Sequence, residues 1–345
     1  MRPGAPILAL NPGSSSLKAA VRTGDDPQPT ASMLIERVGT EIDIATAVEQ
    51  VADAVTQRGL DPEAVAHRVV HGGPHYFDPT VIGDGLLADL RAAVPLAPLH
   101  LPGALETIEH ARRHWPDVPH VACFDTGFYR QLPEVSRRLP VARQLSELGI
   151  RRYGFHGLSV QSVLIARPDI GAAVIAHLGS GCSVTAVGAD GLPRHNTMSF
   201  TPTAGMMSAT RTGDLDPEVA LYLIDEHGYT ADRLRDLFNR DSGLAGVADG
   251  RRDIRDLESA ADDHAALALD MFVQSAAMAI AACATTLDRW QTLVFTGGVG
   301  EHATSVRERI CARLRCDGIE IAVVVADEER VMDRLTRSLV TSLGA

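Results

Sequence analysis

Lysine is almost absent from this chain of 345 residues. Lys18 is the only one, and arginine supplies every other cationic side chain of the Lys/Arg type. A chain that uses arginine so widely keeps a lysine where a compact ammonium, rather than a planar guanidinium, is needed. Chance is the alternative explanation, but Lys18 stands beside a loop rich in glycine and serine, which argues against it.

Net positive charge is also lacking, because 44 Asp and Glu residues outnumber 32 Lys and Arg residues and leave a formal charge of −12. This balance disfavours nucleic acids and anionic membranes as partners, so we expect neither. A long apolar run is missing as well. The most apolar stretch, residues 272–287, contains a glutamine, a serine and two threonines, which predicts a buried helix rather than a membrane span.

Cysteines are few and scattered, and their odd number of five leaves no complete disulfide framework. Cys311 and Cys316 could form half of a metal site, but no second pair follows them. Free thiols in a reducing compartment are the better interpretation. Because the first residues also lack an apolar leader segment, we expect a cytoplasmic protein.

Short apolar runs alternate with segments of helical periodicity, which predicts an α/β protein. The predicted strands are residues 7–10, 19–21, 65–70, 118–124, 172–177, 184–187 and 292–296, and the predicted helices are residues 44–58, 86–94, 104–114, 217–227, 231–239 and 265–290. Residues 23–32 are polar and proline-rich and are expected to form a loop. A strand, a Gly/Ser turn and a returning strand occur twice, near residues 7–21 and 172–187, which indicates two similarly built halves.

Two segments of the first half place charge at a turn and in a strand. Asn11-Pro-Gly-Ser-Ser-Ser-Leu-Lys18 combines small residues, which let backbone amides approach a phosphate, with one ammonium group; a plain serine-rich turn is the alternative. Arg68 lies in an otherwise apolar strand, where a cation is costly to bury without an anionic partner. A substrate carboxylate or phosphate would satisfy it, and so would a structural ion pair. Histidines at positions 67, 71 and 75 suggest a metal, although polar histidines at strand ends are commoner than ligands.

Asp125 and His156 occupy positions where α/β enzymes often hold catalytic groups. Asp125 directly follows the predicted strand 118–124, at the carboxyl end of the sheet, although a loop cap is the alternative. His156 stands in the segment Tyr-Gly-Phe-His-Gly, where glycines allow close approach of the backbone. Such a ring suits the stabilisation of a transferring phosphoryl group, and a satisfied core histidine is the alternative.

Two segments of the second half have a similar character. Arg211 lies in a loop of small residues, where it could reach a phosphoryl oxygen or pair with Asp214 and Asp216. Residues 297–300, Gly-Gly-Val-Gly, follow the predicted strand 292–296. Glycines at the end of a strand suit the close approach of a nucleotide.

Taken together, these segments resemble the acetate kinase family, within the actin and sugar-kinase fold superfamily. The resemblance runs from residue 8 to about residue 329, and the combination of Asn-x-Gly-Ser-Ser-Ser-x-Lys with the segment 200–217 is specific. It implies an α/β fold of two ribonuclease-H-like domains with a central cleft, the first formed by residues 1–126 plus 330–345 and the second by residues 127–329. It also implies a homodimer that transfers a phosphoryl group reversibly between ATP and acetate, giving acetyl phosphate and ADP.

The resemblance further implies roles for the residues that match. His156 and Arg211 would stabilise the transferring phosphoryl group, and Asp125 would organise magnesium or an arginine. Arg68 would clamp the substrate carboxylate, and Mg²⁺ would be associated with Asn11 and Glu328. The apolar pocket around the acetate methyl group would be Val70, Leu99, Phe155 and Pro202. The nucleotide contacts would be Lys18, His177, Leu178, Gly179, Ser180, Gly181, Asp253, Ile254, Arg255, Gly298, Val299, Gly300, Glu301 and His302.

The chain departs from the family pattern mainly on the nucleotide side. The departures are Ser180, Cys182, Ile254 and His302, where the family usually has Asn, Ser, Phe and Asn. The chain is also shorter than usual members, with losses between residues 21 and 44 and between residues 318 and 323. These differences leave the nucleotide preference open.

Other functions stay open beside acetate kinase. The protein could phosphorylate propionate or another short-chain acid, since one methylene in an apolar pocket changes the binding free energy by only about 1–3 kcal/mol. Val70, rather than a smaller residue, favours acetate, and butyrate kinases resemble this chain only at the first loop. A degenerate nucleotide-binding protein with a regulatory role is an alternative of another class. Retention of Arg68, Asp125, His156 and Arg211 together argues against it.

Overall fold

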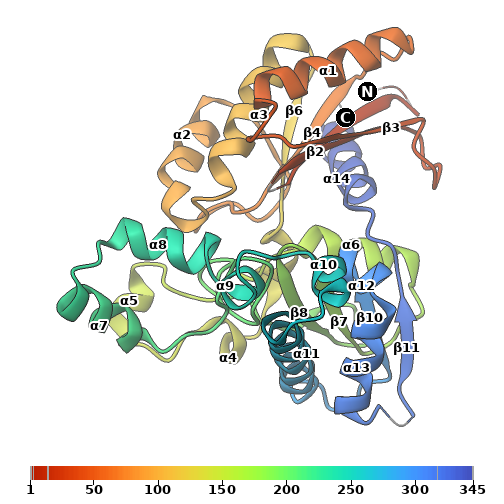
Figure 1. Ribbon diagram of the computed structural model, residues 1–345. Coiled ribbons are helices and arrows are strands. Elements are labelled where there is room, and N and C mark those ends of the chain that lie inside the picture. Colours follow the sequence, from red (N-terminus) through yellow and green to blue (C-terminus); the bar gives the residue numbers. More distant parts are fainter. Residues whose placement is uncertain (1, 3, 14, 317, 344–345) are drawn as a thin grey trace. The chain divides into compact units, whose positions relative to one another are not determined.

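The chain divides into two compact units in the computed structural model, which describes residues 2, 4–13, 15–316 and 318–343 (Figure 1). The first unit contains the described residues of Met1–Arg130, His156–Ser162 and Asp327–Ala345. The second contains Gln131–Phe155 and the described residues of Val163–Ala326. The chain therefore passes between the units at several points, one of them directly before His156 and one directly before Asp327.

A six-stranded sheet forms the centre of the first unit. Its strands are β1 (Pro6–Pro12), β2 (Ser16–Thr23), β3 (Ala31–Glu36), β4 (Ala64–Val69), β5 (Thr80–Val81) and β6 (His120–Phe124), in the order β3-β2-β1-β4-β6-β5. Strands β3, β2 and β1 form an antiparallel meander, whereas β1, β4 and β6 are parallel. The carboxyl ends of the three parallel strands therefore meet at one edge of the sheet.

Helices cover both faces of this sheet. They are α1 (Ile44–Gln57), α2 (Asp84–Ala92), the 3₁₀ turn η1 (Val94–Leu96), α3 (Leu101–His114) and α14 (Glu328–Leu343). The expected apolar face of α1, with Val48, Val51 and Val55, is buried in a cluster with Leu8 and Leu10 of β1. Figure 1 shows α1 and α3 on one side of the sheet and α14 on the other, where it packs against β1 and β4.

The second unit has a sheet built on the same plan. Its strands are β7 (Ala173–Leu178), β8 (Cys182–Val187), β9 (Pro193–Asn196), β10 (Thr292–Thr296) and β11 (Glu320–Val323), in the order β11-β10-β7-β8-β9. Strands β9, β8 and β7 are antiparallel to one another, and β7, β10 and β11 are parallel. The prediction of an α/β fold with two similarly built halves is confirmed.

The helices of the second unit vary in length. They are α4 (Glu134–Arg137), α5 (Arg143–Glu147), α7 (Pro217–His227), α8 (Ala231–Arg240), α9 (Gly243–Val247), α10 (Ile254–Ser259), α11 (Asp263–Ala284), α12 (Gly297–His302) and α13 (Thr304–Leu314). Two further elements cross the boundary between the units: the 3₁₀ turn η2 (Gly127–Gln131) and helix α6 (Gly157–Ala166), which both begin in the first unit and end in the second. Among the described residues α11 alone is long and apolar enough to cross a membrane. Phe272, Val273 and Ile280 of α11 are buried in the core with strands β7, β8 and β10, so it is the buried helix that the sequence predicts.

Several sequence predictions were wrong in detail. Strands β3 and β9 and helix α6 were not predicted, and the expected loop 23–32 already includes the first residues of β3. The expected helix 265–290 ends at Ala284. It ends there because the hydroxyl groups of Thr285 and Thr286 donate to the carbonyl oxygens of Ala282 and Cys283, at 2.6 and 2.7 Å. Such local bonds compete with the helical ladder.

Candidate active site

Arg68 and Asp125 form a buried ion pair at the carboxyl edge of the first sheet. Arg68 Nη2 donates to Asp125 Oδ2 at 2.7 Å, and Arg68 Nε lies 3.1 and 3.2 Å from the two carboxylate oxygens. The Asp125 side chain is 0% exposed and that of Arg68 is 13% exposed. The two residues meet because β4, which contains Arg68, is parallel to β6, which ends one residue before Asp125.

Asn11 extends this pair toward two further carboxylates. Its Oδ1 accepts from Arg68 Nη1 at 3.1 Å, and its Nδ2 donates to Glu328 Oε2 at 2.8 Å and to Glu329 Oε1 at 2.6 Å. Glu328 Oε2 also lies 3.6 Å from Arg68 Nη1. One cation and one amide thus hold three carboxylates together, and both glutamates come from the first turn of α14.

The charges of this cluster shift one another's pKa values. Burial raises the pKa of Asp125 to about 6, Arg68 opposes the rise and Glu328 adds to it. Burial alone would lower the pKa of Arg68, but the carboxylates of Asp125 and Glu328 outweigh burial and raise it. Burial and the neighbouring Glu328 raise the pKa of Glu329, while Asn11 and Lys18 oppose this. The cluster therefore concentrates negative charge around one fixed guanidinium.

We predict that activity depends on the ionisation of Asp125. As the pH falls through about 6, the carboxylate gains a proton and loses its charge-assisted bonds to Arg68, so kcat/KM is expected to fall about tenfold per pH unit below that point. This titration does not itself unfold the protein. A pKa above the unfolded value means that the folded state binds the proton more tightly, so the contribution of Asp125 to stability rises as the pH falls from about 6 toward 3.8.

Initial rates between pH 5 and 8, with thermal unfolding recorded at each pH, check this prediction. The thermal unfolding data show whether a lower rate at low pH is caused by protonation of Asp125 or by unfolding that follows from the titration of other groups. A flat rate profile down to pH 5 in a folded protein would contradict the prediction, because no ionisation in that range would then control the rate.

His156 is held next to Asp125 by the backbone of the first unit. The amide of Gly157 donates to the carbonyl oxygen of Asp125 at 3.0 Å, and a Cβ at Gly157 would lie 2.2 Å from that oxygen. His156 itself has φ +58°, the left-handed conformation that non-glycine residues adopt at a cost. The requirement for glycine at position 157 is therefore steric, and it fixes the start of α6 against the loop after β6.

The remaining predicted residues of the first unit lie on the same elements. Lys18 is exposed on β2, opposite Asn11 of β1, and close enough to Glu329 to affect its pKa. Val70 is buried one residue beyond β4, and Leu99 is half-buried before α3. Ser14 of the first loop lies outside the described residues, but Gly13 N donates to Ser16 O at 2.7 Å across that turn.

The predicted phosphate turn of the second unit lies against the glycines of α12. Strands β7 and β10 are parallel, with His177 opposite Thr296. Gly297 has φ +77°, and a Cβ there would lie 2.8 Å from Leu178 O and 3.1 Å from His177 Nε2. Gly179 N donates to Gly181 O at 3.2 Å, which closes the turn. The two glycine-rich segments thus lie in contact, and a Cβ built at Gly298 would meet no atom within 4 Å.

Arg211 belongs to a loop that is fixed to this turn. Ala209 N donates to Ser180 O at 3.4 Å, and Ser208 N donates to Arg211 O at 3.1 Å. Arg211 is 7% exposed, and its Nη1 donates to Pro202 O at 3.3 Å. Burial raises the pKa of Cys182 to about 12, and the charge of Arg211 partly offsets this, which places Arg211 near the turn.

The two aspartates that follow Arg211 have structural partners. Asp214 Oδ1 accepts from Gly205 N at 2.8 Å, and the Asp216 side chain accepts from Glu218 N at the start of α7. These bonds account for Asp214 and Asp216 without an ion pair to Arg211.

Phe155 and Pro202 are buried in the second unit. Asn196, which is 0% exposed, accepts from Phe155 N at 3.4 Å and donates to Phe155 O at 3.3 Å. Arg152 donates to the carbonyl oxygens of Ser136, Asn196 and Thr197 at 3.0, 2.7 and 3.1 Å. These bonds fix the segment that leads into His156.

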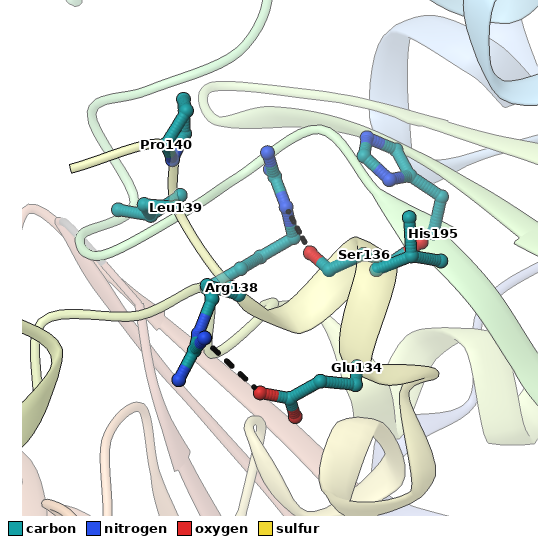
Figure 2. Close-up of a pocket in the computed structure, with 8 residues that line it drawn as sticks. Glu134, Ser136, Arg138, Leu139, Pro140 and His195 are labelled. Carbon is teal, nitrogen blue, oxygen red and sulfur yellow. Dashed lines mark hydrogen bonds and ion pairs between the residues drawn. The ribbon is translucent and has the colours of Figure 1, made fainter. Parts of the chain in front are cut away.

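A pocket of the second unit lies beside this segment (Figure 2). It is lined by Glu134, Val135, Ser136, Arg138, Leu139, Pro140, Arg152 and His195, none of which is a predicted site residue. Burial and the charge of Arg152 lower the pKa of His195 to about 4. The ring is therefore neutral near pH 7.

The predicted nucleoside segments have mixed environments. Asp253 caps α10 by accepting from Arg255 N at 2.9 Å and also bonds the Arg255 side chain, which is 87% exposed. Ile254 is 3% exposed and packs in the core. His302 is exposed at the end of α12. Glu301, in contrast, points its carboxylate at backbone amides of its own unit.

Comparison with known proteins agrees with this geometry. Residues 39–342 match the Acetokinase family. An acetate kinase of Rhodopseudomonas palustris (strain ATCC BAA-98 / CGA009) is 38% identical over 91% of this chain and 87% of that protein. The chain belongs to the acetokinase family.

Solved structures extend the agreement to the fold. A propionate kinase from Francisella tularensis has a TM-score of 0.85 at 27% identity, over 96% of this chain and 98% of that one. The acetate kinase of Porphyromonas gingivalis has a TM-score of 0.80 at 27% identity, over 97% of this chain and 100% of that one. Membership of the acetokinase family and its two-domain α/β kinase fold, both expected from the sequence, are confirmed.

The acidic cluster of this acetokinase suits a shared magnesium site better than a closed one. Among the described residues, no group of three or more His, Cys, Asp or Glu side chains is placed to hold a metal ion. Mg²⁺, however, commonly uses only one or two carboxylates together with substrate phosphates and water. Glu328 and Glu329, joined through Asn11 Nδ2, supply such oxygen donors, so their chemistry fits the ion.

Sequence reasoning missed three polar residues of this framework. Glu329 belongs to the same acidic pair as Glu328, and two adjacent acidic residues at the start of a helix were the available signal. Arg152 and Asn196 gave no comparable signal. Their partners are mostly backbone carbonyl groups far away in the sequence, and such groups leave no trace in side-chain patterns.

Proposed function

We propose that this protein transfers the γ-phosphoryl group of ATP reversibly to acetate, giving acetyl phosphate and ADP. The ion pair of Arg68 with the buried Asp125 is the observation that supports this most directly. Asp125 and Asn11 accept from three of its nitrogens, and Glu328 lies 3.6 Å from one of them. A guanidinium can bond a carboxylate through two N–H groups at once, and the N–H groups beyond these contacts are proposed to bind the substrate carboxylate in that way.

In the proposed reaction an acetate oxygen attacks the γ-phosphorus in line, and the bond to the oxygen of the leaving ADP breaks. Acetate is already ionised at neutral pH, so no general base is required. Asp125 then orients Arg68 rather than accepting a proton. His156 and Arg211 are proposed to donate to the equatorial oxygens of the transferring group, where charge is spread in the transition state.

Nucleotide phosphates are proposed to bind the backbone amides of residues 177–181 and the start of α12, with Lys18 adding one positive charge. Open space at Gly298 supports this, because a backbone without side chains admits close approach. Asn11, Glu328 and Glu329 would hold Mg²⁺, which offsets phosphate charge when it is bound. The substitutions Ser180, Ile254 and His302 leave the preferred nucleotide base a separate question for competition experiments.

Propionate is the second candidate substrate, because one of the similar solved structures is a propionate kinase. We propose acetate as the preferred acid. Val70, which is 5% exposed and lies two residues after Arg68, is proposed to narrow the apolar side of the acid site relative to a smaller residue.

The remaining parts of the proposal concern organisation. We propose that the two units act as the two domains of the kinase and that the enzyme is cytoplasmic, which its five free cysteines favour. A homodimer is proposed because α11 exposes an apolar stripe of Leu267, Met271 and Met278. Light scattering after size-exclusion chromatography would test the dimer.

Acyl phosphate formation tests the function. ATP, Mg²⁺ and acetate, propionate or butyrate are incubated in parallel, and the product is trapped with hydroxylamine. Product that depends on acetate, and that is lost in an Arg68→Lys preparation made in the same way, would establish the reaction and exclude a contaminating kinase. A folded protein that binds ATP but forms no product with any acid would favour the degenerate nucleotide-binding alternative.

A further inference from the structure

Glu301 makes hydrogen bonds that its expected role as a nucleoside contact does not explain. Its Oε1 accepts from Gly297 N at 3.0 Å and from Ala326 N at 3.0 Å, and Thr296 Oγ1 lies 3.5 Å away. Thr296 and Gly297 are buried where β10 joins α12. One carboxylate oxygen therefore joins the start of the glycine helix to a segment 25 residues further along the chain.

Ala326 is the last residue of the second unit, and the chain enters the first unit at Asp327. Asp327 is fixed on its own side: its amide donates to Ser162 Oγ at 3.2 Å, its carboxylate pairs with Arg22, and its Oδ1 accepts from Arg330 N at 2.9 Å. The peptide bond between these residues is thus anchored at both ends.

Glu328 and Glu329 follow at once, and they bond Asn11 in the cluster that contains Arg68 and Asp125. The chain therefore leads from Ala326, which Glu301 bonds to the start of α12, directly to the two carboxylates that bond Asn11. The intervening link is only two or three residues long.

We propose that Glu301 is a positioning residue that couples the glycine helix of the nucleotide site to Glu328 and Glu329. The inference rests on the proposed function and deepens it, because it assigns to one side chain the communication between the ATP site and the acid site. Glu301 does this as a hydrogen-bond acceptor for two amides and not through its charge. A glutamine retains an acceptor oxygen, whereas an alanine leaves both amides without this partner.

Kinetics of Glu301→Ala and Glu301→Gln test the proposal. In Glu301→Ala, KM for ATP is expected to rise and kcat/KM for acetate to fall, each about tenfold. Glu301→Gln should stay within about threefold of the parent enzyme for both substrates. Glu308→Ala, which removes an exposed glutamate of the neighbouring α13, is the matched control and should leave both unchanged.

Hydrogen exchange at the Ala326 amide tests the coupling without turnover. Protection should be lost in Glu301→Ala, kept in Glu301→Gln, and increased by ATP in the parent protein. This arm stays informative even if no acyl phosphate forms, so failure of the coupling and failure of the proposed reaction can be told apart.

Two results would overturn the proposal. Unchanged acetate kinetics and unchanged exchange at Ala326 in Glu301→Ala would show that the bonds transmit nothing. Equal losses in Glu301→Gln and Glu301→Ala would assign Glu301 to a direct charge contact with the nucleotide or its ion.

Discussion

Replacing Arg211 with alanine is expected to lower kcat by about 10³-fold, the loss typical when an arginine that stabilises a transferring phosphoryl group is removed. KM for ATP should change little, because the contact is proposed to strengthen only in the transition state. The guanidinium is already held in place by Pro202 O and by a loop bonded to the phosphate turn, so little reorganisation precedes reaction. Single-turnover rates with ATP and acetate, together with a separate ATP-binding measurement, check both parts.

Lysine at position 211 should recover little of this activity. It keeps the charge but lacks the planar fork that bonds Pro202 and a phosphoryl oxygen at the same time. Arg240→Ala is the matched control, because Arg240 lies on α8 with 62% of its side chain exposed. If Arg211→Ala retained more than about a tenth of the parent kcat, the assignment of Arg211 to the transition state would be wrong.

Removing Arg68 is expected to damage both stability and activity. In Arg68→Ala the Asp125 carboxylate stays buried without a cation, which costs about 3–5 kcal/mol in the free energy of unfolding. The same change removes the proposed carboxylate clamp, so kcat/KM for acetate should fall about 10²- to 10³-fold. Chemical denaturation and acyl phosphate trapping measure the two effects separately.

The double variant Arg68→Ala/Asp125→Ala separates the two roles of this pair. Removal of both charges should restore part of the lost stability, because the Asp125 carboxylate is no longer buried without its cation, while Glu328 and Glu329 still lack the Arg68 guanidinium. Activity should stay at the level of Arg68→Ala. Recovery of activity along with stability would mean that Arg68 is structural only, and Arg37→Ala, at an exposed ion pair, serves as the neutral control.

Sequence reasoning correctly predicted that Arg68 needs an anion, since an arginine in an apolar strand rarely stays unpaired. It left open whether that anion is a substrate or a side chain, and the structure shows a side chain, Asp125, on three of its donor contacts. The structural ion pair is confirmed, and the substrate clamp stays a proposal. The substrate carboxylate is proposed to bind the N–H groups of Arg68 that do not contact Asp125.

Glu301 shows the opposite case. Its place in a Gly-Val-Gly-Glu-His segment after a strand suggests a nucleotide contact, and nothing in the local pattern points to Ala326. Ala326 lies just after strand β11, and Glu301 lies just after strand β10. The bond forms because β10 and β11 are neighbouring parallel strands in the sheet. The role of the residue as a nucleoside contact stays a prediction.

The sequence by itself determined the alternation of strands and helices, the two similar halves, the family and the residue types of the site. These properties depend on local periodicity and short segments, which act over a few residues. Tertiary structure alone decided which polar groups meet: Asn11 and Glu328 are 317 residues apart, and Arg68 and Asp125 are 57 apart. Asn11, Arg68 and Asp125 converge because parallel strands bring their carboxyl ends to one edge of the sheet, and Glu328 joins them because α14 packs against β1 and β4. Burial there makes each charge depend on partners that are distant in the sequence.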